Sequence, residues 1–280
     1  MSNLLRAIIN ISNCTNRQTT NFYKSRVRAN NMGEALEKYI KDAFCNTFDV
    51  VDENKLNEEY SKHFSYLGNQ NNPPDIILKN GDAIEVKKVE SVGSIPLNSS
   101  YPKDKLFANS PMITNDCRNC ERWTEKDIIY AVGVVDKNNN TITHMCFVYG
   151  EDYAANHEIY ERIKNTIKNG VNSIADVEFA ESKELGHVNK VDPLGITYLR
   201  IRGMWGIENP YKVFQYIYNK KNDGTDFFAL INEDRYNSFP KEDIIELENS
   251  DKIIIENCKI KDPNNTAKLK NAKLIRIENK

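Results

Sequence analysis

The sequence lacks a long hydrophobic run, a strong net charge and a dense set of cysteines. No stretch approaches the ~18 apolar residues that a membrane-spanning helix needs, and no apolar segment with a basic flank stands near the N-terminus. We therefore expect a cytoplasmic protein without membrane association. Six cysteines spread over 280 residues do not form the pattern of a small secreted disulfide framework, so we expect reduced thiols.

The charges of the chain nearly cancel, because 38 Lys and Arg residues stand against 40 Asp and Glu residues. A protein that binds nucleic acid through bulk charge is usually strongly basic. Any contact with DNA must therefore use local basic patches. The chain also has no Walker loop and no glycine-rich dinucleotide fingerprint, and its four histidines form no Ser/His/Asp or Cys/His arrangement, so nothing points to ATP, NAD or a nucleophilic triad.

Hydrophobic periodicity predicts both helices and strands. Apolar residues at helical spacing indicate helices over about 3–12, 31–44 and 153–169. A polar, Asn-rich stretch follows the second helix, and residues 90–122 are expected to form a long loop, which is often a functional feature. Short apolar runs indicate strands at 75–78, 82–89, 128–135, 145–149, 196–201, 227–230, 252–255 and 273–277.

The apolar runs on either side of Asn80-Gly81 predict a β-hairpin that carries the most informative residues. Asp75 begins the first run, and Glu85 and Lys87 stand in the second. Two carboxylates can bind a hard cation such as Mg²⁺, which stabilises charge on a phosphate and lowers the pKa of a bound water. The lysine can orient or help to deprotonate that water, or hold the phosphate. These residue types fit metal-assisted hydrolysis of a phosphodiester, although the same pattern also occurs on solvated edge strands.

The length of the turn decides whether the three side chains meet. With a two-residue turn, Asp75 would face Val86 and point away from Glu85 and Lys87. With a three-residue turn at 79–81, in which the glycine is left-handed, Asp75 faces Glu85. Because side chains alternate with period two, the charged residues then share one face and the apolar residues share the other. We predict the three-residue turn.

This segment resembles the PD-(D/E)xK nuclease superfamily. Pro74-Asp75 matches the first element of its motif, and Glu85-Val86-Lys87 matches the second. The resemblance implies an α/β fold with a restriction-endonuclease-like core, in which a mixed central β-sheet is flanked by helices. It also implies that Asp75 and Glu85 bind Mg²⁺ together with the carbonyl oxygen of Val86.

The same resemblance implies that the helix before the hairpin supplies another acidic residue to the metal. Glu37 is our first choice and Glu34 the second. For each of them, a solvated carboxylate on a helix face is an equal alternative.

Two further segments, Leu97–Leu106 (LNSSYPKDKL) and Trp123–Tyr130 (WTEKDIIY), resemble type II restriction endonucleases. Together with the helix at 31–40, they make the N-terminal half of the chain similar to the NgoPII restriction enzyme family, whose members are understood to act on GGCC. The resemblance implies site-specific cleavage of double-stranded DNA that leaves 5′-phosphate ends, and a cognate DNA methyltransferase in the same system. A palindromic target favours a symmetric homodimer.

Residues that could contact DNA lie in the loop after the hairpin and in a later basic segment. Phosphate contacts position a protein, while Arg, Asn and Gln read base edges. For any single candidate, a solvated loop is an equal alternative. The candidates are Asn98, Ser99, Ser100, Lys103, Lys105, Arg118, Arg122, Arg200 and Arg202.

Three questions of organisation and function remain. With no repeat or linker, we predict a single nuclease domain over 1–280, with a catalytic core at about 30–170 and a C-terminal elaboration at about 190–280. Cys117 and Cys120 form a CxxC pair, which alone is too small for tetrahedral zinc; His144 and Cys146 could complete a set, but free thiols are favoured. The alternative functions are a structure-specific repair or recombination nuclease of the same fold, and a catalytically silent DNA-binding protein.

Overall fold

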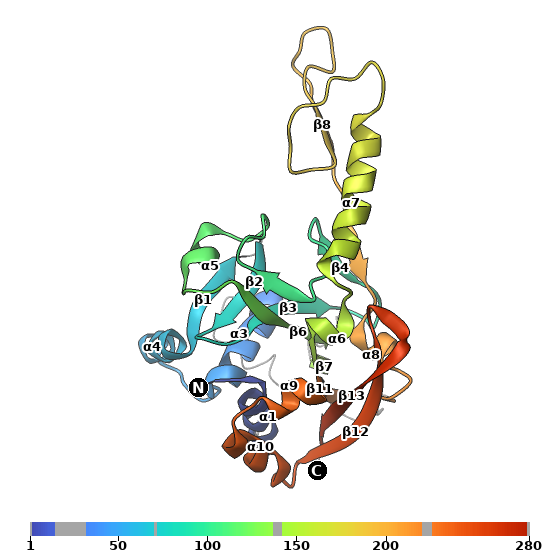
Figure 1. Ribbon diagram of the computed structural model, residues 1–280. Helices are drawn as coiled ribbons and strands as arrows, with labels where there is room; N and C mark the ends of the chain where they lie inside the picture. The colour runs from blue at the N-terminus through green and yellow to red at the C-terminus, as the bar shows by residue number, and fades with distance from the viewer. Residues whose placement is uncertain (1, 15–31, 70–71, 137–141, 220–225, 279–280) are drawn as a thin grey trace.

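The computed structural model describes residues 2–14, 32–69, 72–136, 142–219 and 226–278. A large mixed sheet forms the centre of the molecule, helices flank it, and a long arm projects from it (Figure 1). The prediction of a mixed central sheet flanked by helices is confirmed.

The described helices are α1 (Leu4–Asn13), α3 (Met32–Cys45), α4 (Glu53–His63), α5 (Asn115–Asn119), α6 (Gly150–Tyr153), α7 (His157–Asn172), α8 (Pro210–Val213), α9 (Glu233–Asn237) and α10 (Lys241–Glu248). The described strands are β1 (Phe64–Asn69), β2 (Asn72–Leu78), β3 (Ala83–Val89), β4 (Ile95–Asn98), β5 (Lys105–Phe107), β6 (Glu125–Val135), β7 (Ile142–Tyr149), β8 (Gly186–Val188), β9 (Leu199–Ile201), β10 (Trp205–Ile207), β11 (Asp226–Asn232), β12 (Ile253–Asp262) and β13 (Asn265–Ile277).

The strands of the central sheet follow the order β1-β2-β3-β6-β7-β11-β13-β12, and β5 pairs with β6 beside this path. Two pairings are parallel, β3 with β6 and β7 with β11, and the other pairings are antiparallel. The β2–β3 hairpin and the C-terminal strands therefore belong to one continuous sheet.

Apolar side chains on the strands alternate between two cores, one on each face of the sheet. Ile76 and Ile84 point into the core that α1 and α3 cover, whereas Ile77 and Ala83 point into the core on the other face. Each fully buried aliphatic side chain stabilises the fold by roughly 1.5–3 kcal/mol. This alternation fixes which face of the hairpin is left for polar side chains.

Helices α1 and α3 form where the apolar spacing predicted them. The side chain of Asn3 caps α1 by accepting a hydrogen bond from the backbone N–H of Arg6 at 3.1 Å. Helix α3 approaches the sheet closely because residue 133 is glycine, since a Cβ there would lie 2.7 Å from a δ carbon of Leu36. The close packing sets the position of α3 beside the β2–β3 hairpin.

The sequence pattern does not predict several elements. The polar stretch after α3 contains α4 and β1, the expected loop at 90–122 contains β4, β5 and α5, and helices α9 and α10 follow β11. Helix α4 has no apolar stripe that would predict it, and Tyr60 is its one buried residue. Strands β4 and β5 have only four and three residues and depend on pairing with β10 and β6, which are distant in the sequence. The expected helix at 153–169 occupies 157–172, and the expected strand at 196–201 shortens to 199–201.

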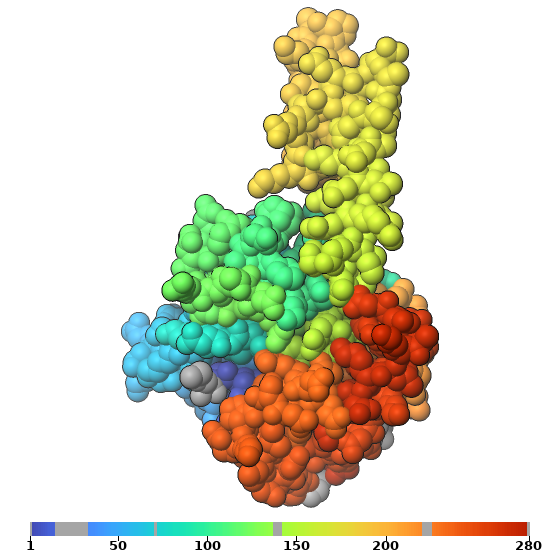
Figure 2. Space-filling view, viewed as in Figure 1, coloured from blue at the N-terminus to red at the C-terminus, as the bar shows by residue number. Residues whose placement is uncertain are grey.

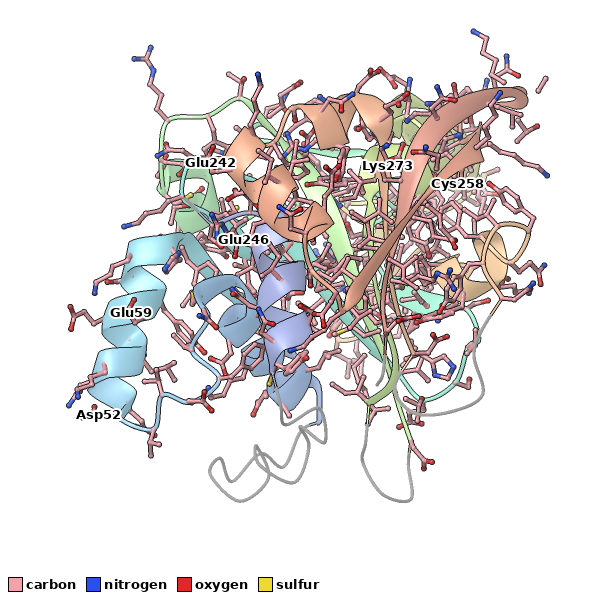
Figure 3. The ribbon with its side chains drawn as sticks, turned by 90° about the horizontal axis from the view of Figure 1, so that it is seen from below. Asp52, Glu59, Glu242, Glu246, Cys258 and Lys273 are labelled. Atoms are coloured by element: carbon pink, nitrogen blue, oxygen red, sulfur yellow. The ribbon has the colours of Figure 1, made fainter. Side chains whose placement is uncertain are left out.

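Figure 3 shows the two ends of the sheet from below. Helix α4, with its N-cap Asp52 and with Glu59 on it, lies at one end, and the β12–β13 hairpin, which carries Cys258 and Lys273, lies at the other. Within the described ranges, no helix is long and apolar enough to cross a membrane.

The arm comprises residues 157–204 and stands clear of the body of the molecule (Figures 1 and 2). Its helix α7 has no buried residue, and its strands β8 and β9 pair with each other outside the central sheet. Directly after the arm, β10 pairs with β4 and returns the chain to the body.

Candidate active site

The turn between β2 and β3 has three residues, as predicted. The strand register pairs Ile76 with Ile84, and this register places Asp75 across from Glu85. The backbone confirms the turn length, because the N–H of residue 78 donates to the carbonyl oxygen of residue 82 at 2.9 Å. The register is therefore the one in which the charged residues of the two strands can meet.

The conformation inside the turn differs from the prediction. The left-handed residue is Asn80, with a φ of 53°, and Gly81 lies outside the left-handed region, so that detail was wrong. Asparagine is one of the few residues besides glycine that adopt this conformation at low cost. A Cβ on Gly81 would lie 3.1 Å from the Cβ of Leu78, so the small size of glycine suits its position.

Asp75, Glu85 and Lys87 lie close together on this hairpin. The Oδ2 atom of Asp75 accepts a hydrogen bond from the backbone N–H of Val86 at 2.6 Å. The Nζ atom of Lys87 donates to Oε1 of Glu85 at 2.6 Å. The structure thus brings together the three side chains that the motif selected.

Burial and mutual charge perturb this cluster. Burial raises the pKa of Asp75, and the negative charge of Glu85 raises it further. Burial alone would lower the pKa of Lys87, but the charge of Glu85 and the hydrogen bond to it, together with Asp75, raise that pKa above its ordinary value. Asp75 therefore resists ionisation when no cation is near, whereas Lys87 stays protonated.

A small cavity of about 20 Å³ adjoins Glu85 and is also lined by Lys103 and Tyr130. Tyr130 lies beside Glu85 because β3 and β6 pair in parallel in this register. Its hydroxyl accepts a hydrogen bond from the backbone N–H of Lys103 at 2.7 Å. Oε2 of Glu85 is buried and has no hydrogen-bond partner among the described residues. The cavity is large enough for about one water molecule.

Lys103 is a buried part of this site, although the sequence assigned it to an exposed DNA-contact loop. Its relative exposure is 7%. Its Nζ atom donates to Oγ of Ser100 and lies 3.5 Å from the carbonyl oxygen of Tyr101. Burial lowers the pKa of Lys103 to about 8, against the opposing effect of the charge of Glu85.

Helix α3 brings Glu37 into electrostatic reach of the hairpin, because its charge contributes to the raised pKa of Asp75. The carboxylate of Glu37 pairs with Lys41 at 2.6 Å. Glu34, the second choice, is exposed on the same helix. No three His, Cys, Asp or Glu side chains of the described ranges gather closely enough to hold a metal ion. Asp75 and Glu85, which face each other in the strand register, are the two carboxylates of the cluster.

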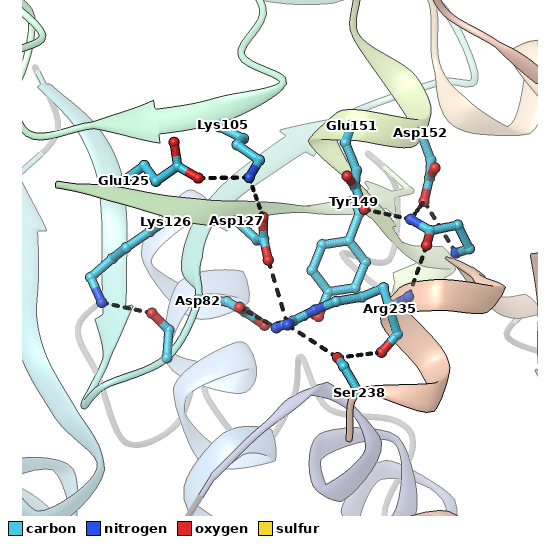
Figure 4. Close-up of polar contacts among 12 residues, drawn as sticks. Asp82, Lys105, Glu125, Lys126, Asp127, Tyr149, Glu151, Asp152, Arg235 and Ser238 are labelled. Atoms are coloured by element: carbon cyan, nitrogen blue, oxygen red, sulfur yellow. Dashed lines mark hydrogen bonds and ion pairs between the residues drawn. The ribbon is translucent and has the colours of Figure 1, made fainter. Parts of the chain in front are cut away.

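The predicted DNA-contact residues fall into three groups. Asn98 and Ser99 are exposed at the end of β4, next to Ser100 and the cavity. Lys105 lies near them but pairs with Glu125 at 2.9 Å, as Figure 4 shows.

The second group contains Arg118 and Arg122, near α5. The guanidinium of Arg118 donates to the carbonyl oxygens of Ala108 and Ser110, at 2.7 and 3.0 Å, so it holds the loop together. Arg122 is exposed.

The third group contains Arg200 and Arg202, which lie on the arm. Both guanidinium groups bind Glu184, each with an N–O distance of 2.6 Å. The arm therefore separates these two arginines from the other predicted DNA contacts.

The base of the arm joins the loop that carries Lys103. The ring of Tyr101 stacks on that of Tyr160 in α7, with centroids 5.6 Å apart, and its hydroxyl donates to Glu161 at 2.9 Å. Trp205 meets the Tyr101 ring edge-on at 5.9 Å. Beside these rings lies an open pocket of about 360 Å³, whose lining includes Lys103 and Glu161. The base of the arm and the loop that carries Lys103 are thus packed together.

A buried ionic network connects the turn of the β2–β3 hairpin to helix α9, which lies in the C-terminal part of the chain (Figure 4). Arg235 of α9 donates to Oδ1 of Asp82 at 2.5 Å, and the hydroxyl of Tyr149 donates to Oδ2 at 2.8 Å. Arg235 also lies 3.5 Å from Asp127. Burial raises the pKa of Asp82, and the charge of Arg235 opposes that rise.

Sequence reasoning missed Tyr130 and Arg235 as parts of the site. Tyr130 reaches Glu85 through the register of two parallel strands, which no local pattern reveals. Arg235 reaches Asp82 across 153 residues of sequence. One signal in the sequence pointed to Tyr130: it is the last residue of the segment Trp123–Tyr130, which resembles type II restriction endonucleases.

The cysteines do not form a zinc site. Cys117 and Cys120 are free thiols, and the part of the chain that the structure describes holds no group of three or more His, Cys, Asp or Glu side chains that could bind a metal ion. Burial raises the pKa of the Cys117 thiol to about 12, so it stays protonated.

The similarity of this chain to known proteins extends over almost its whole length. No solved structure matches it. The chain is 51% identical over 275 residues to the type II restriction enzyme NgoPII of Neisseria gonorrhoeae, an alignment that covers 98% of each chain. The family model for NgoPII restriction endonuclease matches residues 2–261. The resemblance seen in the N-terminal half thus extends over nearly the full length, and the chain belongs to the NgoPII restriction endonuclease family.

Proposed function

We propose that this protein is a type II restriction endonuclease that hydrolyses double-stranded DNA at a specific sequence, with Asp75, Glu85 and Lys87 as its catalytic residues. The observation that carries the proposal is the position of these three side chains within electrostatic reach of one another on one hairpin, in a chain that belongs to a restriction endonuclease family. The full length of the alignment to a type II restriction enzyme supports the same activity.

The carboxylate pair fits Mg²⁺. Oε2 of Glu85 has no hydrogen-bond partner in the described structure, and burial, together with the negative charge of Glu85, raises the pKa of Asp75. Asp75, Glu85 and the carbonyl oxygen of Val86 would hold the ion by oxygen ligands, as Mg²⁺ prefers. Glu37, placed within electrostatic reach, would add negative charge beside them. When bound, Mg²⁺ supplies positive charge to the reacting phosphate and makes water easier to deprotonate.

Lys87 acts in this scheme as a cation rather than as a base. Its raised pKa keeps it protonated at neutral pH. A protonated lysine can orient the attacking water and hold a phosphate oxygen, but it cannot accept a proton. Its hydrogen bond to Glu85 keeps the ammonium group in place before the substrate arrives.

The finer parts of the proposal concern the substrate and the assembly. We place the target at GGCC, the protein in the cytoplasm, and a cognate DNA methyltransferase in the same system. The active form is a homodimer in which each protomer of a single nuclease domain cuts one strand, because a palindromic target has twofold symmetry. The DNA contacts we assign are Asn98, Ser99, Ser100, Lys105, Arg118, Arg122, Arg200 and Arg202.

A plasmid of known sequence, incubated with the protein and Mg²⁺, tests the function. Discrete fragments with ends at one sequence are expected, and Asp75→Ala should abolish them. Asp116→Asn is the control, because Asp116 is an exposed acidic residue of α5 outside the cluster, and it should cleave like the wild type. Random nicking would support the repair nuclease instead, and no cleavage would support a silent DNA-binding protein.

A further inference from the structure

Lys103 is an unusual residue for the interior of a protein. Its side chain is buried, but no carboxylate of the described residues lies within the 4.0 Å that defines an ion pair with it. It has two neutral oxygen partners instead, Oγ of Ser100 and the carbonyl oxygen of Tyr101. A buried charge without a counter-ion destabilises the fold. A contribution to stability therefore does not explain why a lysine stands at this position.

Contacts through Tyr130 place Lys103 beside β3, the strand that carries Glu85 and Lys87. The hydroxyl of Tyr130 fixes the backbone of Lys103, and Tyr130 itself stands beside Glu85 in the sheet. Lys103 and Glu85 line the same small cavity. Lys87 binds Oε1 of Glu85, while Oε2 is the oxygen left without a partner.

The charges of the cluster show what a second lysine contributes. Asp75 and Glu85 carry two negative charges when ionised, and Lys87 and Lys103 carry two positive charges, so the four side chains sum to zero. With a divalent cation the sum becomes positive by two. A phosphodiester gains negative charge on its oxygens as it is attacked, and fixed positive charge in a site shielded from water stabilises that gain.

We propose that Lys103 is a second catalytic lysine, which binds an oxygen of the scissile phosphate at the cavity that it lines together with Glu85. The inference rests on the proposed function, because it assigns a role in phosphodiester hydrolysis. It replaces the general DNA contact that the sequence predicted for this residue with a contact to the reacting group.

Lys103→Met tests the assignment with two measurements, the melting temperature and kcat. If the lysine were purely structural, both would fall together. Methionine has a similar length and no charge, so the metal-free variant should melt at a higher temperature than the wild type. In the presence of Mg²⁺ its kcat should fall by roughly 100-fold, the usual effect of removing one group that stabilises a transition-state oxyanion. Its KM for DNA should change little.

Two further variants complete the test. Lys103→Arg keeps the positive charge and should recover part of the lost kcat. Lys88→Met removes a charge from the same strand as Glu85, where Lys88 pairs with Glu90 at 3.0 Å, and should leave kcat unchanged. If Lys103→Met lowers the melting temperature and kcat together, or raises KM alone, or cleaves at the wild-type rate, the assignment is overturned. Failure of the proposed function is a separate result, since Asp75→Ala would then cleave as the wild type does.

Discussion

Asp75 is the residue whose ionisation most directly links the fold to the chemistry. Burial and the neighbouring Glu85 raise its pKa to about 8 in the folded protein, against 3.8 for the free group. Between these values the folded state binds more protons than the unfolded state, so the metal-free protein should lose stability as pH rises. The side chain that suits a cation is therefore a source of instability without one.

Asp75→Asn should remove this pH dependence. Asparagine can still accept the hydrogen bond from the N–H of Val86 but carries no charge. The variant should be more stable than the wild type in the presence of EDTA, by more than about 1 kcal/mol at pH 8, because one pKa unit corresponds to about 1.4 kcal/mol. Urea unfolding at pH 5 and pH 8 measures the difference, which should be smaller at pH 5. An equal difference at both values would show that Asp75 is not perturbed in this way.

The β2–β3 hairpin is the element that determines whether the proposed catalytic residues meet. Its left-handed residue, Asn80, allows a mutation that tests the turn without touching the site. Asn80→Ala should destabilise the protein by about 1–2 kcal/mol, since a Cβ without a compensating polar group disfavours this conformation. Asn80→Gly should be close to neutral. Thermal unfolding of the two variants measures the contrast, and equal melting temperatures would place the strain elsewhere.

How far the sequence predicts each element depends on how local its determinants are. The turn length follows from nearby residues, because one register alone buries Ile76 and Ile84 while joining Asp75 to Glu85. The partners of that hairpin do not follow, because Tyr130 and Lys103 depend on strand pairings between separate segments. Helix α4 escaped prediction for a related reason, since its contacts with the body involve one buried residue.

On the scale of the whole molecule, exposed apolar surface is concentrated on the arm. Sixteen large apolar side chains are exposed among the described residues, and eleven of them lie between 157 and 204. Ile159, Ile163 and Ile167 form a stripe along α7, with exposures of 40%, 44% and 48%. Side chains this exposed contribute little to the stability of the single chain.

Replacing these three isoleucines with glutamine should therefore leave the melting temperature of the dilute protein within a few degrees of the wild-type value, because a change within about 0.5 kcal/mol per exposed site is usual. Differential scanning calorimetry measures the shift. As a matched comparison, Ile8→Gln on the fully buried face of α1 should lower the melting temperature strongly. A large loss of stability in the arm variant would mean that the stripe is covered in solution.

The ion pair between Arg235 and Asp82 has a consequence for the order in which the protein becomes competent during its own synthesis. The β2–β3 hairpin is synthesised first, and the cation that pairs with its buried Asp82 is made 153 residues later. Strand β11, which lines up beside β7 in the central sheet, precedes that cation by only a few residues. A nascent chain can therefore carry all the side chains that we propose as catalytic and still lack the ion pair that supports their hairpin. The full support of the hairpin can therefore form only after synthesis of the chain has passed Arg235.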